Sequence, residues 1–420
     1  MSDPAPIVWL AGCDWWYHPR RSEAHYAALL AGRRRVIFVN SMTMGIGRTS
    51  ARALGAKLAR KLRSILRCHR QVRERLTVVT PLAIPLFGLA GVRRINGWLL
   101  RRQLGLIRRA LGPALPGQGP ATPGRGGVRR DALAGPVRPI VIVANPLFGD
   151  ALEALRPRAV VYFVTDKLDA DPETASALIA RADRRMAERA DRIVCVSQVL
   201  CRAYAGHGAK VEYLPHGVDF AHFAAAGGPG TVPDDLASLA PPVAGYVGST
   251  ESVSFDADLF VRTADLLPRW SFVLIGPVDD PAPYAGRRNV HLLGPRPYER
   301  LPEYLRGMAV CLLPLRQTEW VRYCNPVKLR EYLAAGKPVV STDMPELRRL
   351  GRLVHVAQGA PAFAEAIERA WAEDDPARRA ARAAAVRDDT WDRRLETLEA
   401  ILQSLDDARK EPLCAASAAW

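Results

Sequence analysis

A lysine and a glutamate lie one helical turn apart in the stretch CNPVKLREYLAAGKPVVS, residues 324–341. A short helix is expected there, with Asn325 as its N-cap and Pro326 at its first position. Free N–H groups and the helix dipole attract phosphate, and Lys328 adds a full positive charge. Glu331 lies on the same face one turn deeper, where its carboxylate can accept hydrogen bonds from two hydroxyls. The pair could hold a diphosphate and its attached ribose, or it could be an ordinary surface ion pair.

Short apolar, β-branched runs, most of them followed by helix-like stretches, must position this helix. Such runs are typical of strands that are buried on both faces of a parallel sheet. Their number and spacing predict an α/β fold with two Rossmann-like, doubly wound domains that face a cleft. The predicted strands are residues 7–11, 36–40, 140–144, 160–164, 192–196, 243–247, 271–275, 290–293, 309–313 and 338–341.

The chain divides where the motif YLPHGVDFAHF separates the two sets of strands. We expect a first domain over residues 1–218, which binds the acceptor, and a second over 219–385, which binds the nucleotide. Residues 113–139 are rich in Gly and Pro and predict a flexible insertion. Residues 386–420 are expected to form a helix and tail that return to the first domain, with Trp391 as the anchor. A plain surface helix is the alternative.

The net charge of +16 comes from the first part of the chain. Residues 1–150 contain 25 Lys and Arg against 6 Asp and Glu, so an anionic partner is expected there. Basic residues and leucines at helical spacing predict an amphipathic helix over 48–75. This helix either packs on the core with a solvated basic face or lies, with the uncharged stretch 76–92, on an anionic membrane surface. Nucleic acid is not an expected partner, because the basic residues lack interleaved aromatic side chains.

Seven scattered cysteines form no CxxC pair, which indicates neither a zinc site nor a disulfide framework. The N-terminus lacks the basic region and long apolar run of a secretory signal. The longest uncharged stretch contains two prolines, which argues against a spanning helix. We therefore expect a reduced, cytoplasmic setting.

Several motifs occur together, in order, over about residues 140–400. They are LPHGVDF, PPVAGYVGSTES, WSFVLIGPV, NVHLLGPRPYERLPEYL, VCLLPLRQTEWVRYCNPVKL and EYLAAGKPVVS. This combination resembles the C-terminal signature of GT-B glycosyltransferases, especially the bacterial group 1, family 4-like enzymes. There a glutamate precedes a small-residue segment and then GxPVV, as it does here.

The resemblance implies roles for the residues of the second domain. Glu331 would hold the donor ribose and Lys328 the diphosphate at the helix start. Arg316 and Arg322 would add positive charge beside the site, unless they are plain surface arginines. The remaining donor residues would be Asn325 and Pro326 at the helix start, Gly248, Ser249 and Thr250 in a glycine loop, and Arg296 near the base.

Sugar transfer by inversion needs a base on the first domain, at the carboxyl end of a strand that faces the cleft. Asp166, directly after a predicted strand, is the first candidate, and Asp14 and His18 follow. Asp166 could instead cap a helix, and His18 could simply line the cleft. Many retaining relatives carry an additional glutamate where Tyr323 stands here, so retention and inversion both remain open. No metal-binding DxD signal lies near the diphosphate site, so we expect no cofactor and a metal-independent reaction.

The resulting hypothesis is a glycosyltransferase that moves a sugar from a nucleotide-diphosphate donor to a glycan or lipid-linked acceptor. The acceptor would be an intermediate of a surface polysaccharide, and the enzyme would lie on the inner face of the plasma membrane. A sugar-nucleotide epimerase could share the fold and donor site, but it would not need a basic, apolar acceptor surface. A basic nucleic-acid-binding protein is a further alternative.

Overall fold

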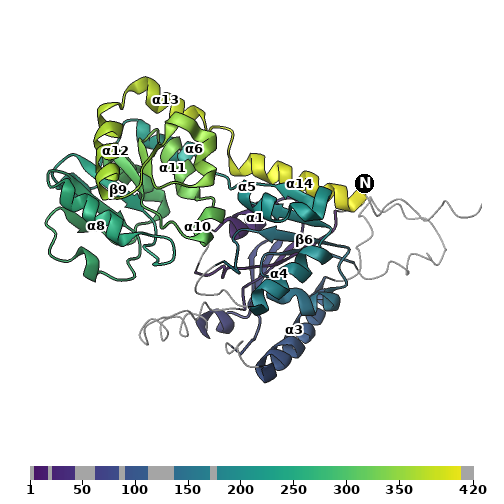
Figure 1. The fold of residues 1–420 in the computed structure, drawn as a ribbon. Coiled ribbons are helices and arrows are strands. Elements are labelled where there is room, and N and C mark those ends of the chain that lie inside the picture. Colours follow the sequence, from purple (N-terminus) through teal and green to yellow (C-terminus); the bar gives the residue numbers. More distant parts are fainter. Residues whose placement is uncertain are drawn as a thin grey trace, which may run out of the picture.

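The computed structural model describes residues 4–17, 21–42, 62–84, 90–111, 137–170 and 177–407. These residues form two lobes, each a mainly parallel sheet with helices on both faces (Figure 1). The two doubly wound sheets confirm the predicted fold class, and each has its own hydrophobic core. All ten predicted strands are present.

The first sheet has eight strands in the order β3-β4-β2-β1-β5-β6-β7-β8. Every neighbouring pair is parallel except β3 and β4, which are antiparallel. The strands are β1 (Ile7–Leu10), β2 (Val36–Val39), β3 (His69–Arg73), β4 (Leu76–Val79), β5 (Ile140–Val143), β6 (Ala159–Val164), β7 (Arg192–Cys195) and β8 (Val211–Tyr213). Its helices are α1 (Ser22–Leu30), α3 (Ala90–Ala110), α4 (Ala177–Arg189) and α5 (Gln198–Ala203), with 3-10 segments η1 (Pro146–Leu155) and η2 (Ala205–Lys210).

The second sheet is parallel throughout, in the order β11-β10-β9-β12-β13-β14. Its strands are β9 (Val243–Val247), β10 (Ser271–Ile275), β11 (Val290–Leu292), β12 (Val310–Leu313), β13 (Val339–Ser341) and β14 (His355–Val356). The helices are α6 (Phe220–Ala224), α7 (Asp234–Ala237), α8 (Ala257–Leu266), α9 (Leu301–Gly307), α10 (Glu319–Tyr323), α11 (Val327–Ala334), α12 (Ala360–Ala372) and α13 (Pro376–Ala384). Its 3-10 segments are η3 (Ala225–Gly227), η4 (Ala282–Tyr284), η5 (Tyr298–Arg300) and η6 (Pro345–Leu353).

The last helix, α14 (Trp391–Asp407), returns to the first domain as expected and lies across it (Figure 1). Trp391 packs edge-on against Tyr26, with ring centroids 5.5 Å apart. Gly217 makes this approach feasible, because a Cβ there would lie 2.7 Å from the Cα of Trp391. At the other end of α14, the buried Arg34 pairs with Asp406, with 2.7 Å between Nη1 and Oδ2. An aromatic contact and a buried ion pair therefore fix the helix at both ends.

The predicted basic helix over 48–75 is wrong in its last part. Residues 62–66 are helical, but His69–Arg73 forms the exposed edge strand β3. Leu76–Val79, part of the stretch expected to be an apolar loop, forms β4, and its alternate side chains enter the core. Because these five residues are exposed, a helix over them would bury no apolar face. Their pairing with β4 stabilises a strand instead. Residues 43–61 and most of the predicted insertion 113–139 lie outside the described residues.

Among the described helices, none is long and apolar enough to cross a membrane.

Candidate active site

The reversals of strand order place the functional loops. Strand order reverses beside β1 and β5 in the first sheet, and beside β9 and β12 in the second. In open α/β sheets, ligands bind beyond the carboxyl ends of the strands at such points. A cavity of about 310 Å³ lies between the two domains. Its walls include Arg21, Glu23 and Asp166 from the first domain and residues 324–328 from the second.

Lys328, in the first turn of α11, points to the loop after β9. Its Nζ donates to the hydroxyl of Tyr246 at 2.8 Å and lies 4.7 Å from the centre of that ring. The Tyr246 hydroxyl in turn donates to the carbonyl of Ser249 at 2.9 Å. Burial lowers the pKa of Lys328, but Tyr246 and the nearby Glu331 and Glu251 outweigh it, so the pKa is raised. The amine is therefore held in place and charged.

Two glycines leave bare backbone around this amine. Gly248 has φ +149°, and a Cβ there would lie 2.6 Å from Nζ of Lys328. Gly276, which follows β10 with φ +145°, would place a Cβ 2.1 Å from the carbonyl oxygen of Gly248. No side chain fits at either position without moving the loop. Thr250 is buried, and its Oγ1 accepts from the backbone of Asp279 at 3.3 Å. The predicted loop of Gly248, Ser249 and Thr250 thus lies beside Lys328.

Glu331 follows Lys328 by one turn of α11. Burial raises the pKa of its carboxyl to about 7, although the charge of Lys328 opposes that shift. A carboxyl group with this pKa is poised between the protonated and ionised forms near neutral pH. Only the ionised carboxylate is a pure hydrogen-bond acceptor.

The predicted cap of α11 is wrong by one residue. The helix begins at Val327, Pro326 is its N-cap with an extended backbone, and the cap has no side-chain hydrogen bond. Asn325 is buried and joins the domains instead, because its Nδ2 donates to the carbonyl of Val196 at 2.7 Å. Its Oδ1 accepts from the buried Arg330 at 2.6 Å. Asn325 therefore holds the start of α11 against the first domain.

Three predicted arginines lie apart from Lys328. Arg296 donates to Asp235 and Tyr304, each at 2.6 Å, in a separate surface pocket. Arg316 is exposed, and its Nε donates to the carbonyl of Phe255 at 3.2 Å. Arg322 is exposed on α10. None of the three lines the 310 Å³ cavity.

Of the three predicted bases, Asp166 lines the cavity. It follows β6 and lies close to Arg21. Burial lowers the pKa of Arg21, but Asp166 and other negative groups raise it overall, so the guanidinium stays charged. The carboxylate of Asp14 accepts instead from Ser64 at 2.7 Å and from the backbone of Trp16 at 3.0 Å. His18 lies outside the described residues.

Glu23 and His216 also line the cavity, although neither was among the predicted site residues. Glu23 is 4% exposed, and one of its oxygens accepts from the indole of Trp9 at 3.2 Å and the backbone of Gly12 at 2.9 Å. Burial raises its pKa to about 7. His216, in the HG pair of the joint, is 8% exposed, and its Nδ1 has no hydrogen-bond partner among the described residues. Burial, with the charge of Arg330, lowers its pKa to about 3, so the imidazole is neutral.

Within the described ranges, no group of three or more His, Cys, Asp or Glu residues is suited to a metal ion. Metal independence itself stays a prediction.

Comparison with known proteins identifies the second domain. Residues 241–373, which contain the glycine loop and α11, match the family Glycosyl transferases group 1. Sucrose-phosphate synthase from Thermosynechococcus elongatus has the same fold over the whole chain, with a TM-score of 0.63, 16% identity, and coverage of 96% of this chain and 100% of that chain. The chain therefore has the GT-B fold, and residues 241–373 are similar to the group 1 glycosyl transferases.

Two further proteins are similar to this chain. Anabaena Alr3699/HepE, solved with UDP and glucose, aligns with a TM-score of 0.59 at 14% identity, over 97% of this chain and all of that chain. The putative teichuronic acid biosynthesis glycosyltransferase TuaH of Bacillus subtilis (strain 168) is 29% identical over 185 residues. That match spans 41% of this GT-B protein and 45% of TuaH, less than half of each. The predicted fold is thus confirmed, and the family match of residues 241–373 supports the predicted glycosyltransferase class.

Proposed function

We propose that this protein transfers a sugar from a nucleotide-diphosphate donor to a glycan or lipid-linked acceptor of a surface polysaccharide. The observation that carries the proposal is the position of Lys328, with its amine held by Tyr246 directly above the bare backbone of Gly248. A diphosphate needs positive charge and close backbone approach, and this loop offers both. The solved complex of Alr3699/HepE with UDP supports a uridine nucleotide as the first donor to test.

Residues on opposite walls of the cavity would stabilise the leaving group and activate the acceptor. As the glycosidic bond to the donor breaks, negative charge grows on the diphosphate, and Lys328 with the N-terminus of α11 would stabilise it. If the sugar inverts, Asp166 would accept the proton of the attacking hydroxyl. Tyr323, which replaces an additional glutamate of many retaining relatives, packs against the core of the first domain.

The two residues that the sequence did not single out would assist from the same cavity. Glu23 and Arg21 lie beside Asp166 and would adjust its charge. The neutral His216 could accept a hydrogen bond from a sugar hydroxyl, or donate one, through its unpartnered Nδ1. These groups belong to the first domain and Lys328 to the second, so a reaction step that uses both would need the whole cleft.

An acceptor on a membrane is supported by the outer face of α3. Ile95, Trp98 and Leu106 are each at least 50% exposed, and Arg102 stacks 5.2 Å from the Trp98 ring. The spacing of these residues places them on one stripe of the helix. An amphipathic helix that shows apolar and arginine side chains outward is suited to an anionic lipid surface. We propose peripheral attachment through this stripe, on the inner face of the plasma membrane.

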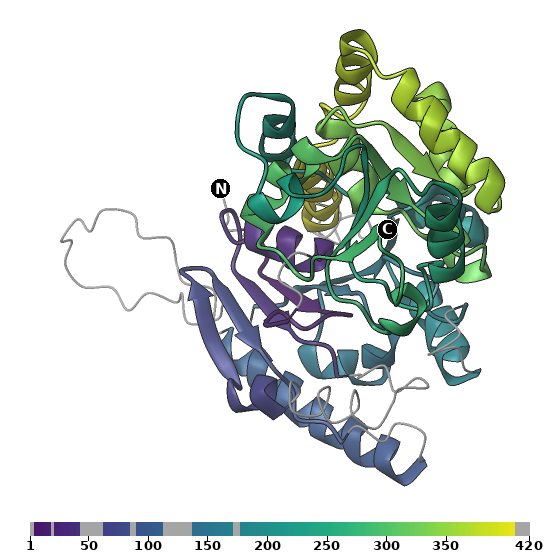
Figure 2. The same ribbon diagram turned by 90° about the vertical axis from the view of Figure 1, so that its left-hand side faces the viewer.

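The described residues before α3 also expose apolar side chains. Asn96 makes two hydrogen bonds of 2.8 Å to the backbone of Ile84, and Gln103 holds the backbone of Leu82 at 2.8 and 3.0 Å. Leu82 and Ile84 are 48% and 36% exposed. These hydrogen bonds fix the backbone of Leu82 and Ile84 to α3, which lies at the end of the first domain away from the second domain (Figure 2).

The test is isothermal titration with UDP, GDP and dTDP and their sugar conjugates, using wild-type protein and Glu331→Ala. We expect one nucleotide to bind best and the variant to bind it roughly tenfold or more weakly, because hydrogen bonds to a charged acceptor are each worth about 1.5–3 kcal/mol. Equal affinity of both proteins for every nucleotide would contradict the donor site. A new product from nucleotide-sugar alone would indicate an epimerase.

A further inference from the structure

The first domain has a second concave site, at the end remote from the cleft. A pocket of about 640 Å³ lies at the amino ends of β5, β6 and β7. Asp166 follows the carboxyl end of β6, so the six residues of that strand, about 20 Å in length, separate the two sites. The charged residues that line the pocket are Arg108, Arg138, Arg156, Arg158, Arg189, Glu153 and Asp191.

Three of the five arginines are engaged by protein groups. Arg189 donates to Glu153. Arg158 donates to the backbone carbonyl of Asp406 at 2.5 Å and lies 3.8 Å from its carboxylate. Arg138 donates to the carbonyls of Arg156 and Pro157, at 3.3 and 2.9 Å. These contacts fix the walls of the pocket.

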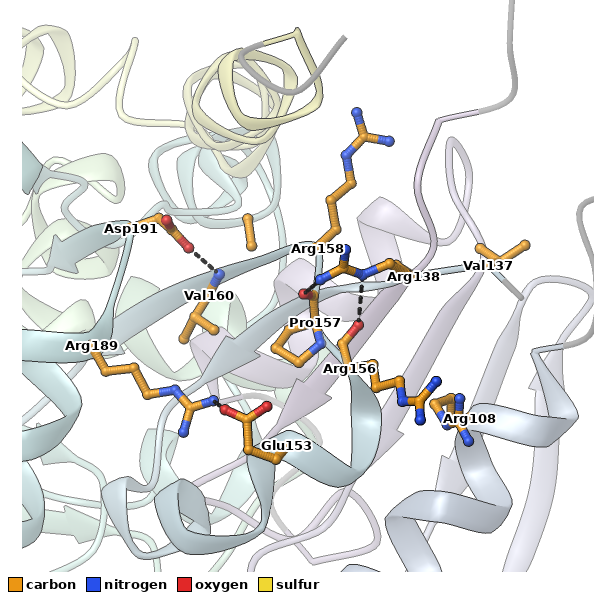
Figure 3. Close-up of a pocket in the computed structure, with 11 residues that line it drawn as sticks. Arg108, Val137, Arg138, Glu153, Arg156, Pro157, Arg158, Val160, Arg189 and Asp191 are labelled. Carbon is orange, nitrogen blue, oxygen red and sulfur yellow. Dashed lines mark hydrogen bonds and ion pairs between the residues drawn. The ribbon is translucent and has the colours of Figure 1, made fainter. Parts of the chain in front are cut away.

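The remaining two arginines carry charge with no counterpart. Arg108 extends from the last turn of α3, and Arg156 from the left-handed residue after η1, where φ is +47°. Neither side chain makes a hydrogen bond or ion pair with any residue in the described ranges, and Nε of Arg108 is buried without a partner. Figure 3 shows both guanidinium groups on the same side of the pocket. Like charges repel, so an anion between them would be stabilised.

We propose that this arginine pocket binds a phosphate-bearing ligand between Arg108 and Arg156. A phosphate monoester carries a charge of about −1.5 to −2 near neutral pH, which matches the two unpaired guanidinium groups. Each guanidinium presents its N–H groups as a planar fork that fits phosphate oxygens in pairs. The pocket is open enough for more than one phosphate, so a pyrophosphate or a phosphate on a lipid headgroup fits the same chemistry. The site is independent of the donor cleft.

The binding test uses pyrophosphate, at constant ionic strength, with Lys328→Ala as the background so that the cleft contributes little. In that background we compare the pocket variant Arg108→Gln/Arg156→Gln with the control Arg70→Gln/Arg75→Gln. The control removes two exposed charges from the same domain at the β3–β4 edge. We expect the pocket variant to bind pyrophosphate at least tenfold more weakly in titration calorimetry, and to lose the rise in Tm that pyrophosphate gives. The control should keep both.

A second arm distinguishes the source of the phosphate. Full-length pocket and control variants are floated with vesicles of phosphatidylglycerol and of phosphatidylcholine. Weaker binding of the pocket variant to phosphatidylglycerol alone would assign the site to a lipid headgroup, and a loss of pyrophosphate binding alone would assign it to a free phosphate ligand. Without ligand, the Tm of the pocket variant should equal or exceed that of wild type, because a repulsion is removed. If pocket and control variants behave alike in both arms, the proposal is wrong.

Discussion

Lys328 is the residue on which the donor site depends most. Its amine lies between the ring of Tyr246 and the backbone of Gly248, and its pKa is raised, so it is charged at neutral pH. This arrangement is set before any ligand arrives. Pre-organised charge of this kind stabilises a transition state without reorganisation during the reaction.

Replacing Lys328 with Ala should therefore lower kcat at saturating donor by about 10²–10³, the usual loss for one charge-stabilising group. Affinity for the nucleoside should change less, since that charge acts mainly on the leaving diphosphate. Steady-state kinetics with a UDP-sugar measure both parameters. Lys210→Ala, at a lysine that donates to the backbone of Glu188 in the first domain, serves as the control. Wild-type kcat in Lys328→Ala would make this lysine a structural charge only.

Asp166 is the one predicted base that the described structure brings into the cleft. Asp166→Asn should reduce transfer by about 10²–10⁴, the range for loss of a general base, while the Kd for the donor changes little. The comparison variant is Asp14→Asn, since the Asp14 carboxylate accepts from Ser64 and Trp16. We expect it to keep most of its transfer rate. An active Asp166→Asn enzyme would point to a retaining reaction or to His18.

At the scale of elements, every interior strand except β4 was predicted, whereas of the four described edge strands only β11 was. The interior strands consist of apolar residues that are buried on both faces, such as Ile140–Val143. The edge strand His69–Arg73 is mostly polar and lies on the surface, and β8 and β14 have only three and two residues. Edge strands need no apolar face, so the sequence carries little signal for them.

The site residues also fall into those that the sequence could identify and those that it could not. Lys328 and Glu331 belong to one helix and one motif, so their relation could be read from spacing. Glu23 and His216 come from distant parts of the chain, and only the fold brings them to one cavity. The one hint for His216 in the sequence was the HG pair at the joint. The glycine of that pair, Gly217, admits the close approach of Trp391.

The proposed membrane attachment depends on α3. Replacing Ile95, Trp98 and Leu106 with Ser should weaken binding to anionic vesicles by roughly a hundredfold, if each side chain contributes about 1 kcal/mol on partial burial. Vesicle flotation at low salt measures this. The control replaces Leu266, Leu292 and Val356, which are 51%, 40% and 44% exposed on the second domain. Equal flotation of both triple variants would contradict attachment through α3.

At the scale of the whole molecule, the two domains are joined by buried polar groups as well as by apolar packing. Asn325 bonds across the cleft to Val196, and Glu346 accepts from the backbone of Gln198 at 2.6 Å. The strand-like bridge from Val218 to Thr390 ties the joint to the start of α14. These polar groups give up hydrogen bonds to water and form hydrogen bonds to each other only when the two domains meet. Contact between the domains therefore contributes to the stability of the folded protein. Ionisable groups at the cleft should therefore be visible in the stability of the whole protein.

Glu23 should make the free energy of unfolding depend on pH. Its pKa is about 7 in the folded protein because it is buried, and 4.5 is its ordinary value. Between these values the unfolded chain has already released the proton, while the folded protein still holds it. The free energy of unfolding should therefore fall as pH rises from 4.5 to 7, by about 3 kcal/mol from this group alone.

Glu23→Gln should remove that part of the pH dependence. Both hydrogen bonds from Trp9 and Gly12 go to one carboxylate oxygen, so the amide oxygen of Gln can accept both. His216 acts in the opposite sense, since its pKa is lowered to about 3 and protonation at low pH favours unfolding, but it is present in both proteins and cancels in the difference. Urea unfolding at pH 5, 6, 7 and 8 measures that difference. We expect the variant to gain stability relative to wild type as pH rises, with most of the gain below pH 7. Parallel curves would mean that Glu23 is ionised in the folded protein and that the cleft holds it as a carboxylate beside Asp166.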